Sequence, residues 1–103
     1  MNQKFELKDA QVEKVNGGYT IMGITITPQT MLQAFLNDPS QAKSYLALIM
    51  QFDTTGVASI IKEFNAGGIP CPLCADGSVQ DQAAFINANR QWLIDNGYTI
   101  KNA

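Results

Sequence analysis

Two prolines in this chain each follow a residue that commonly caps helices, and these pairs determine where helices can begin. Thr27 precedes Pro28, and Asp38 precedes Pro39. Threonine and aspartate side chains accept hydrogen bonds from the first free amides of a helix, and proline fits the first helical position. The pairs therefore predict one helix from Pro28 and a second over about 39–52. Apolar residues follow at helical spacing in the first of them: Met31, Leu32, Phe35 and Leu36.

Two further helices are expected later in the chain. A third helix is predicted over about 55–65, and a last one from a cap at Ser78 to about Asn96. The segment 69–77 contains two prolines and a glycine, so it is predicted to be a loop. The helix over 39–52 is apolar nearly all round at its C-terminal end, which predicts that it is the central helix of the core.

Residues 19–27 are rich in β-branched side chains, which favour a short strand or an extended stretch with Gly23 as a bulge. The tetrapeptide Gly-Tyr-Thr-Ile occurs at 18–21 and again at 97–100, so these two stretches could pair. The sequence thus predicts a mostly α fold. We expect a flexible N-terminal leader helix and then a small bundle of about four short helices. A minor two-stranded β patch is compatible with this fold.

The composition excludes several classes of function. The chain has 103 residues, which is one ordinary domain, and it has no histidine. A Ser-His-Asp or Cys-His enzyme is therefore excluded unless a partner supplies the base. The net charge of −2 and the isoelectric point of about 4.8 argue against a nucleic-acid binder. No phosphate-binding loop or metal-ligand cluster is apparent, so we expect no enzyme activity, cofactor or metal.

Residues 4–15 carry Phe5, Val12 and Val15 roughly on one side of a helix, with charged residues over most of the remainder. This pattern predicts a short amphipathic helix that ends before Gly17. A helix of about 12 residues is too short to be stable alone in water, so it should be flexible until a partner binds its apolar side. The segment lacks the basic start and continuous apolar middle of an ordinary secretory signal.

The spacing of the apolar residues ahead of the two glycines is informative. Counted back from Gly18 as position −1, Gly17 is at −2, Val15 at −4, Val12 at −7 and Leu7 at −12. This pattern resembles the double-glycine leader of bacteriocin and peptide-pheromone precursors. The resemblance covers residues 1–18, and the remaining residues 19–103 would be the cargo.

The resemblance implies a partner and a cleavage site. The papain-like cysteine protease domain of a peptidase-containing ABC transporter would bind residues 1–18, cleave after Gly18 and export the cargo. The peptidase domain would recognise four residues of the leader: Leu7, Gln11, Val12 and Val15. Gln11 stands where the family usually has Glu, and Lys8 stands where Ser is frequent. Both departures keep a polar, exposed character.

The chemistry of such a cleavage fits these residue types. A papain-like protease holds its substrate extended in a narrow cleft, where only glycine presents no side chain that can clash. An amphipathic helix lying in a hydrophobic groove would supply the affinity. The resemblance further implies synthesis in the bacterial cytoplasm, secretion after leader removal, and an antimicrobial or signalling cargo. Nothing in the sequence supports membrane contact by that cargo.

Two other functions are compatible with the sequence. The chain could be a small cytoplasmic helical binding module, in which the N-terminal helix packs on the core. It could also be the precursor of a modified peptide with a long leader that is cut after Gly68. The second double glycine has polar residues at the anchor positions, with Asn65 at −4 and Lys62 at −7, so the anchor pattern fails there.

Cys71 and Cys74 form a C-x-x-C pattern with several interpretations. A 71–74 disulfide formed after export is the default for two cysteines in an exported peptide. Thioredoxin-like chemistry would place the motif after a strand and at a helix start. Zinc needs four ligands, so a zinc site would require a dimer. The two remaining interpretations are a thioether to a dehydrated Ser78 or Thr99, and two free buried thiols.

Overall fold

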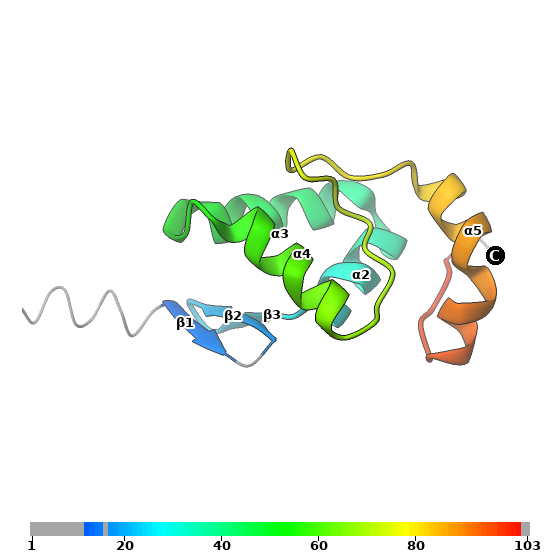
Figure 1. Cartoon of the computed structure of the whole chain (residues 1–103), viewed down its shortest axis with the longest axis horizontal. Helices are drawn as coiled ribbons and strands as arrows, with labels where there is room; N and C mark the ends of the chain where they lie inside the picture. The colour runs from blue at the N-terminus through cyan, green and yellow to red at the C-terminus, as the bar shows by residue number, and fades with distance from the viewer. Residues whose placement is uncertain (1–11, 16, 102–103) are drawn as a thin grey trace, which may run out of the picture.

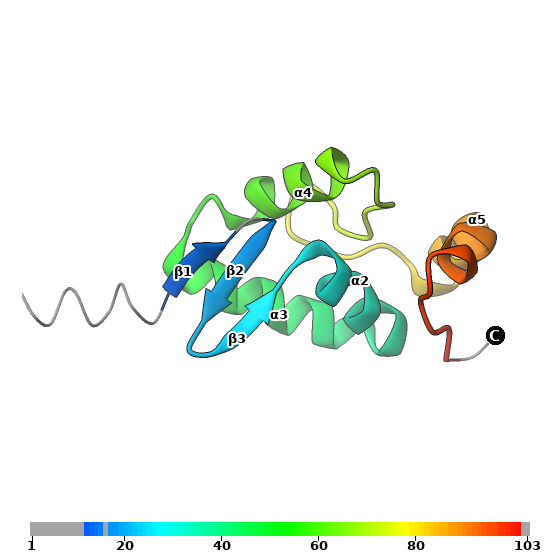
Figure 2. The same ribbon diagram turned by 90° about the horizontal axis from the view of Figure 1, so that it is seen from below.

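The computed structural model describes residues 12–15 and 17–101, and it consists of a small sheet followed by helices (Figure 1). The strands are β1 (Val12–Val15), β2 (Gly18–Ile21) and β3 (Ile24–Ile26). The helices are α2 (Pro28–Asn37), α3 (Pro39–Phe52), α4 (Gly56–Ala66) and α5 (Gln82–Asp95). The prediction of a mostly helical fold with a minor antiparallel sheet is confirmed. The sheet and α5 lie at opposite ends of the molecule in both views (Figure 2).

The sheet is antiparallel and three-stranded, with β2 in the middle between β1 and β3. Met22 and Gly23 form the two-residue turn between β2 and β3, and both have positive φ, at 51° and 84°. Gly23 is therefore a turn residue, and its prediction as a bulge was wrong. The alternative in which 18–21 pairs with 97–100 is not formed, because 18–21 pairs with its neighbours in sequence and 97–100 forms no strand.

The helix starts predicted from the capping pairs are confirmed. The Thr27 hydroxyl accepts a 3.2 Å hydrogen bond from the Thr30 amide, and Pro28 is the first residue of α2. The Asp38 carboxylate accepts a 3.0 Å hydrogen bond from the Ser40 amide at the start of α3. These caps satisfy amides that have no partner within the helix.

The last helix begins later than the sequence suggests. Ser78 donates through its amide and hydroxyl to Asp76, so it belongs to a turn in the preceding loop. An isolated β-bridge between Leu73 and Val79 then keeps the chain extended beyond this turn. Asp81 is the actual cap of α5, and its side chain accepts from the Ala84 amide at 3.0 Å. The predicted cap at Ser78 was therefore wrong.

The central helix of the core is α2, and the prediction that α3 has this position was wrong. Six of the ten residues of α2 are buried: Pro28, Met31, Leu32, Ala34, Phe35 and Leu36. Only three are buried in the 14-residue α3: Ala42, Leu46 and Ile49. Helix α2 contacts β3, α3, α4 and α5, whereas the apolar C-terminal end of α3 is partly open to solvent, with Met50 41% exposed.

Helix α5 and the residues after it are attached to α2 by specific contacts. The Phe35 and Phe85 rings meet edge to face, with centroids 5.2 Å apart. The Gln33 side chain donates to the carbonyl of Thr99 at 2.9 Å and accepts from its amide at 3.0 Å. Trp92 stacks on Tyr98. These contacts hold the C-terminal segment against the helical core.

Within the described residues, no single helix is long and apolar enough to cross a membrane. Helices α3 and α4 reach the required length and apolarity only when taken together, and the chain bends by 120° between them. Both helices contribute buried side chains to the core, including Leu46 and Ile49 from α3 and Phe64 from α4.

Candidate processing site

The double glycine lies where β1 turns back into β2. Gly17 is in the turn with a φ of +87°, a backbone conformation that favours glycine. Gly18 is buried, begins β2 and is directly opposite Val15 of β1. The predicted cleavage site, the peptide bond from Gly18 to Tyr19, is therefore part of the middle strand of the sheet.

Gly18 approaches the neighbouring strand too closely for any side chain. A Cβ atom at position 18 would overlap the carbonyl oxygen of Ile26 and would lie 2.9 Å from the Cα of Thr27. Both are backbone atoms, so neither can move aside as the end of a flexible side chain could. The folded sheet thus requires glycine at position 18 for a structural reason.

Tyr19, the residue after the predicted cleavage site, is anchored in the helical part of the molecule. Its side chain is 3% exposed, and its hydroxyl donates a 2.6 Å hydrogen bond to Oδ2 of Asp53 between α3 and α4. Oδ1 of Asp53 accepts from the amide and hydroxyl of Thr55, at 2.9 and 2.6 Å. Burial and the hydrogen bond to Asp53 raise the pKa of Tyr19, partly offset by a hydrogen bond with Ser59.

Of the four residues that the peptidase is predicted to recognise, the structure describes only Val12 and Val15. Val12–Val15, the end of the helix expected over 4–15, form strand β1 with Val12 opposite Ile21, and the rest of that expected helix lies outside the described residues. These residues form a strand and not a helix because β2 follows directly in the sequence and offers backbone hydrogen-bond partners that a short isolated helix lacks. Leu7 and Gln11 lie outside the described residues.

The second double glycine has a different setting. Gly67 and Gly68 are exposed and follow the last turn of α4, where Gly68 has a φ of +68°. The next amide, that of the buried Ile69, donates to the Phe64 carbonyl at 3.0 Å. This is the arrangement in which a glycine ends a helix and the chain returns to the core.

The two cysteines lie in a loop with an ordered backbone. Both are free thiols and half-buried. The Cys74 amide donates to the Ser78 carbonyl at 2.8 Å, which closes the turn, and the Cys71 thiol donates to the Leu73 carbonyl at 3.7 Å. Burial raises the pKa of Cys71, and the nearby Cys74 adds to this rise. A thioredoxin-like nucleophile needs a lowered pKa instead.

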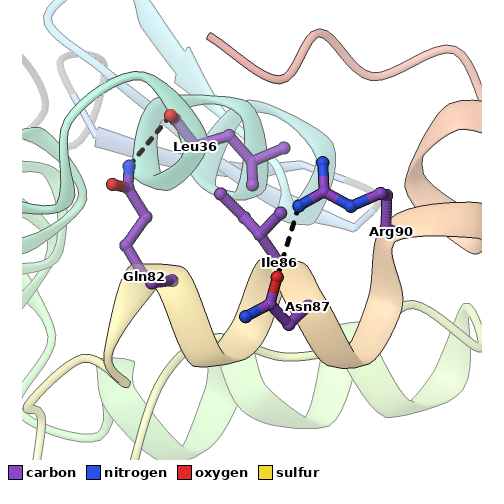
Figure 3. Close-up of a pocket in the computed structure, with 6 residues that line it drawn as sticks. Leu36, Gln82, Ile86, Asn87 and Arg90 are labelled. Atoms are coloured by element: carbon purple, nitrogen blue, oxygen red, sulfur yellow. Dashed lines mark hydrogen bonds between the residues drawn. The ribbon is translucent and has the colours of Figure 1, made fainter. Parts of the chain in front are cut away.

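A hollow of about 170 Å³ lies between the end of α2 and α5, and most of the side chains that line it are shown in Figure 3. Each of its three polar side chains, Gln82, Asn87 and Arg90, already makes a hydrogen bond within the protein. The Gln82 amide donates to the carbonyls of Phe35 and Leu36, at 3.0 and 2.9 Å, and Arg90 donates to the Asn87 side chain at 3.3 Å. The hollow is smaller than most ligand pockets, which run to about 300–1,000 Å³.

The structure brings Val12, Val15, Gly17 and Gly18 into one hairpin and adds a contact that the sequence analysis missed, between Tyr19 and Asp53. No pattern in a single sequence signals a pair 34 residues apart. In the part of the chain that the structure describes, no three His, Cys, Asp or Glu side chains are grouped to hold a metal ion. Comparisons with known protein families, curated proteins and solved structures find no match to this chain.

Proposed function

We propose that this chain is the precursor of an exported peptide. Residues 1–18 are its double-glycine leader, and the peptidase domain of an ABC transporter removes that leader by cleavage after Gly18. The observation that carries this proposal is the spacing of Leu7, Val12 and Val15 ahead of the two glycines, which resembles that of bacteriocin and peptide-pheromone leaders. The cargo, residues 19–103, acts outside the cell as an antimicrobial or a signal.

The proposed cargo contains a hydrophobic core of its own, with buried side chains from Tyr19 to Leu93. Removal of residues 1–18 takes away β1, one of the two strands that pair with β2, and leaves these core side chains in the cargo. Four helices and the turn between β2 and β3 remain in the product.

The cysteines have a role under this proposal. In the oxidising surroundings outside the cell, a disulfide forms between Cys71 and Cys74, and an extracellular disulfide or oxygen accepts the two electrons and two protons. The expected sign is the loss of two hydrogen atoms from the mass of the secreted product. Serine substitution at either cysteine removes this mass difference.

Cleavage of the full chain by the peptidase domain of a double-glycine-cleaving transporter tests the proposal. Mass spectrometry should find a product that begins at Tyr19. Gly17→Val and Gly18→Val should abolish this product, because a side chain at either position clashes in the cleft. Val12→Asp and Val15→Asp should mainly raise KM. An uncut chain, or one cut at another bond, contradicts the proposal.

The second double glycine provides the matched control. Gly67→Val and Gly68→Val should leave the product that begins at Tyr19 unchanged. A product that begins at Ile69 would instead favour a long leader that ends at Gly68. Gly17→Val and Gly18→Val also disturb the sheet, which should make the Gly18–Tyr19 bond more accessible. A loss of cleavage in these variants therefore cannot be due to burial of that bond.

A small helical binding module is the second candidate, and one observation favours it. The hairpin itself accounts for both glycines, through the positive φ of Gly17 and the contact of Gly18 with Ile26. In this case β1 is a permanent part of the domain. A chain that keeps residues 12–15 in its functional form, and that no such peptidase cuts, supports this candidate.

A further inference from the structure

The bond that the peptidase would cut is enclosed on both sides by the sheet. Gly18 and Tyr19 lie opposite Val15 and Lys14 of β1, and Tyr19 lies opposite Ile26 of β3. A protease that holds its substrate as an extended chain needs the backbone groups around the bond to be accessible. A paired middle strand has no free edge to offer.

Opening β1 alone does not make the bond available. The Tyr19 side chain is buried and its hydroxyl bonds to Asp53, while Gly18 rests against the backbone of Ile26. Tyr19 must leave this position before the Gly18–Tyr19 bond can enter a cleft. The contact with Asp53 therefore opposes cleavage even after β1 has separated from β2.

The same residues also serve two incompatible conformations. Val12 and Val15 form strand β1 in the folded chain, whereas recognition by a groove would use them as anchors on one side of a helix. A residue cannot be in both conformations at once. Pairing with β2 and binding to the peptidase therefore compete for these residues.

We propose that the folded sheet blocks its own processing, so that the peptidase cleaves only molecules in which β1 and β2 have come apart and Tyr19 has left Asp53. This inference rests on the proposed function and adds its regulation. The cleavage rate then follows the population of the opened form, because opening precedes cleavage. Folding of the cargo before export lowers that population and protects the precursor.

A disulfide across the hairpin tests this inference directly. Glu13 and Thr20 are directly opposite each other, and such antiparallel pairs have Cα atoms about 4.5–5.5 Å apart, within the range that a disulfide spans. The chain would carry Glu13→Cys and Thr20→Cys, with Cys71→Ser and Cys74→Ser to avoid wrong pairing. The chain with only the two serine substitutions is the control.

The expected result is that the reduced form is cut after Gly18 at a rate close to that of the control, and the oxidised form at least tenfold more slowly. Equal rates for the oxidised and reduced forms overturn the inference and leave the proposed function intact. If the control and the reduced form both stay uncut, the proposed function fails, and the inference fails with it.

A second pair of variants tests the contact between Tyr19 and Asp53 with substitutions that lie outside the leader. Asp53 and Asp76 both accept hydrogen bonds from the amide and hydroxyl of the residue two positions later, Thr55 and Ser78. Of these two aspartates, only Asp53 also holds Tyr19. Asp53→Ala should raise the cleavage rate about tenfold, the effect of losing a hydrogen bond to a charged group, and Asp76→Ala should not change it.

Circular dichroism on both variants should show unchanged helix content, so that a faster cut reports opening of the sheet. If Asp53→Ala loses helix content, Tyr19→Phe replaces it, since that change removes the same hydrogen bond and keeps the ring. Equal cleavage rates in the wild type, Asp53→Ala and Tyr19→Phe would overturn the assignment of this contact.

Discussion

The hydroxyl of Tyr19 donates a 2.6 Å hydrogen bond to Oδ2 of Asp53, 34 residues further along the chain. The other oxygen of the same carboxylate accepts from Thr55 at the start of α4. One aspartate thus orders the junction between α3 and α4 and also fixes the middle strand of the sheet. Through this carboxylate the stability of the sheet depends on the helical core.

Tyr19→Phe should lower the free energy of unfolding by about 1–2 kcal/mol, because a hydrogen bond to a charged acceptor is lost. Urea unfolding followed by circular dichroism measures this change. Tyr45→Phe is the matched control, since the Tyr45 hydroxyl has no hydrogen bond to any residue that the structure describes. If both substitutions cost the same, the Tyr19 contact contributes nothing specific.

The chain should lose stability at alkaline pH through Tyr19. Burial and the hydrogen bond to Asp53 raise the pKa of Tyr19, and the nearby charges of Asp53 and Glu63 add to this. The unfolded pKa is about 10. A raised folded pKa means that the contribution is complete below about pH 10 and is lost as pH rises through the folded pKa.

Urea unfolding of the wild type and of Tyr19→Phe between about pH 8 and 11.5 checks this expectation. The difference in unfolding free energy between the two proteins should be constant up to about pH 10 and should shrink above it. The remaining tyrosines are the same in both proteins, so their effects cancel in the comparison. A constant difference across the whole range would contradict the raised pKa of Tyr19.

Alanine substitution should separate the structural needs of the two hairpin glycines. Gly18→Ala places a Cβ against the Ile26 carbonyl and should cost about 3 kcal/mol. A side chain at position 17 would meet open space, so only the positive φ opposes Gly17→Ala, which should lower the free energy of unfolding by about 1 kcal/mol. Thermal unfolding measures both effects. Equal losses would show that Gly18 does not sit against β3 in solution.

The Cys71 thiol should react slowly at neutral pH. Because burial raises its pKa, little thiolate is present at pH 7, and the thiolate is the reactive form. In the Cys74→Ser variant, labelling of Cys71 by an aromatic disulfide reagent should be several-fold slower than labelling of free cysteine. The rate should rise with pH beyond the usual thiol range, about 8.5. Fast labelling at pH 7 would favour a redox role.

Local capping made the starts of α2 and α3 predictable, whereas β1 was not predicted because the residues that signal its hairpin turn also suit the end of a helix. The capping side chains of Thr27 and Asp38 act within three residues, so the sequence alone locates the starts of α2 and α3. Val12 and Val15 are three apart, which suits a helix, yet Asn16 and Gly17 form the Asn-Gly pair that is typical of hairpins. A helix stop and a hairpin turn use the same residues, and the adjacent strand decides between them.

Tertiary position was the harder part to predict. The apolar residues of α3 exceed what its position can bury, so Met50 stays 41% exposed while α2 is enclosed by its neighbours. The predicted site residues near Gly18 are close together because they are close in sequence. Their contact with Asp53 depends on how α3 and α4 pack, which no local pattern encodes.

The middle position of β2 has a consequence for the product. Cleavage after Gly18 would give Tyr19 a positively charged amino group at the first position of the strand and remove the neighbour on one side. The amide and carbonyl of Thr20, which face Glu13 of β1 in the precursor, would then point to solvent. A strand edge of this kind pairs readily with another extended chain. The exported peptide would therefore carry an open pairing site that β1 occupied in its precursor.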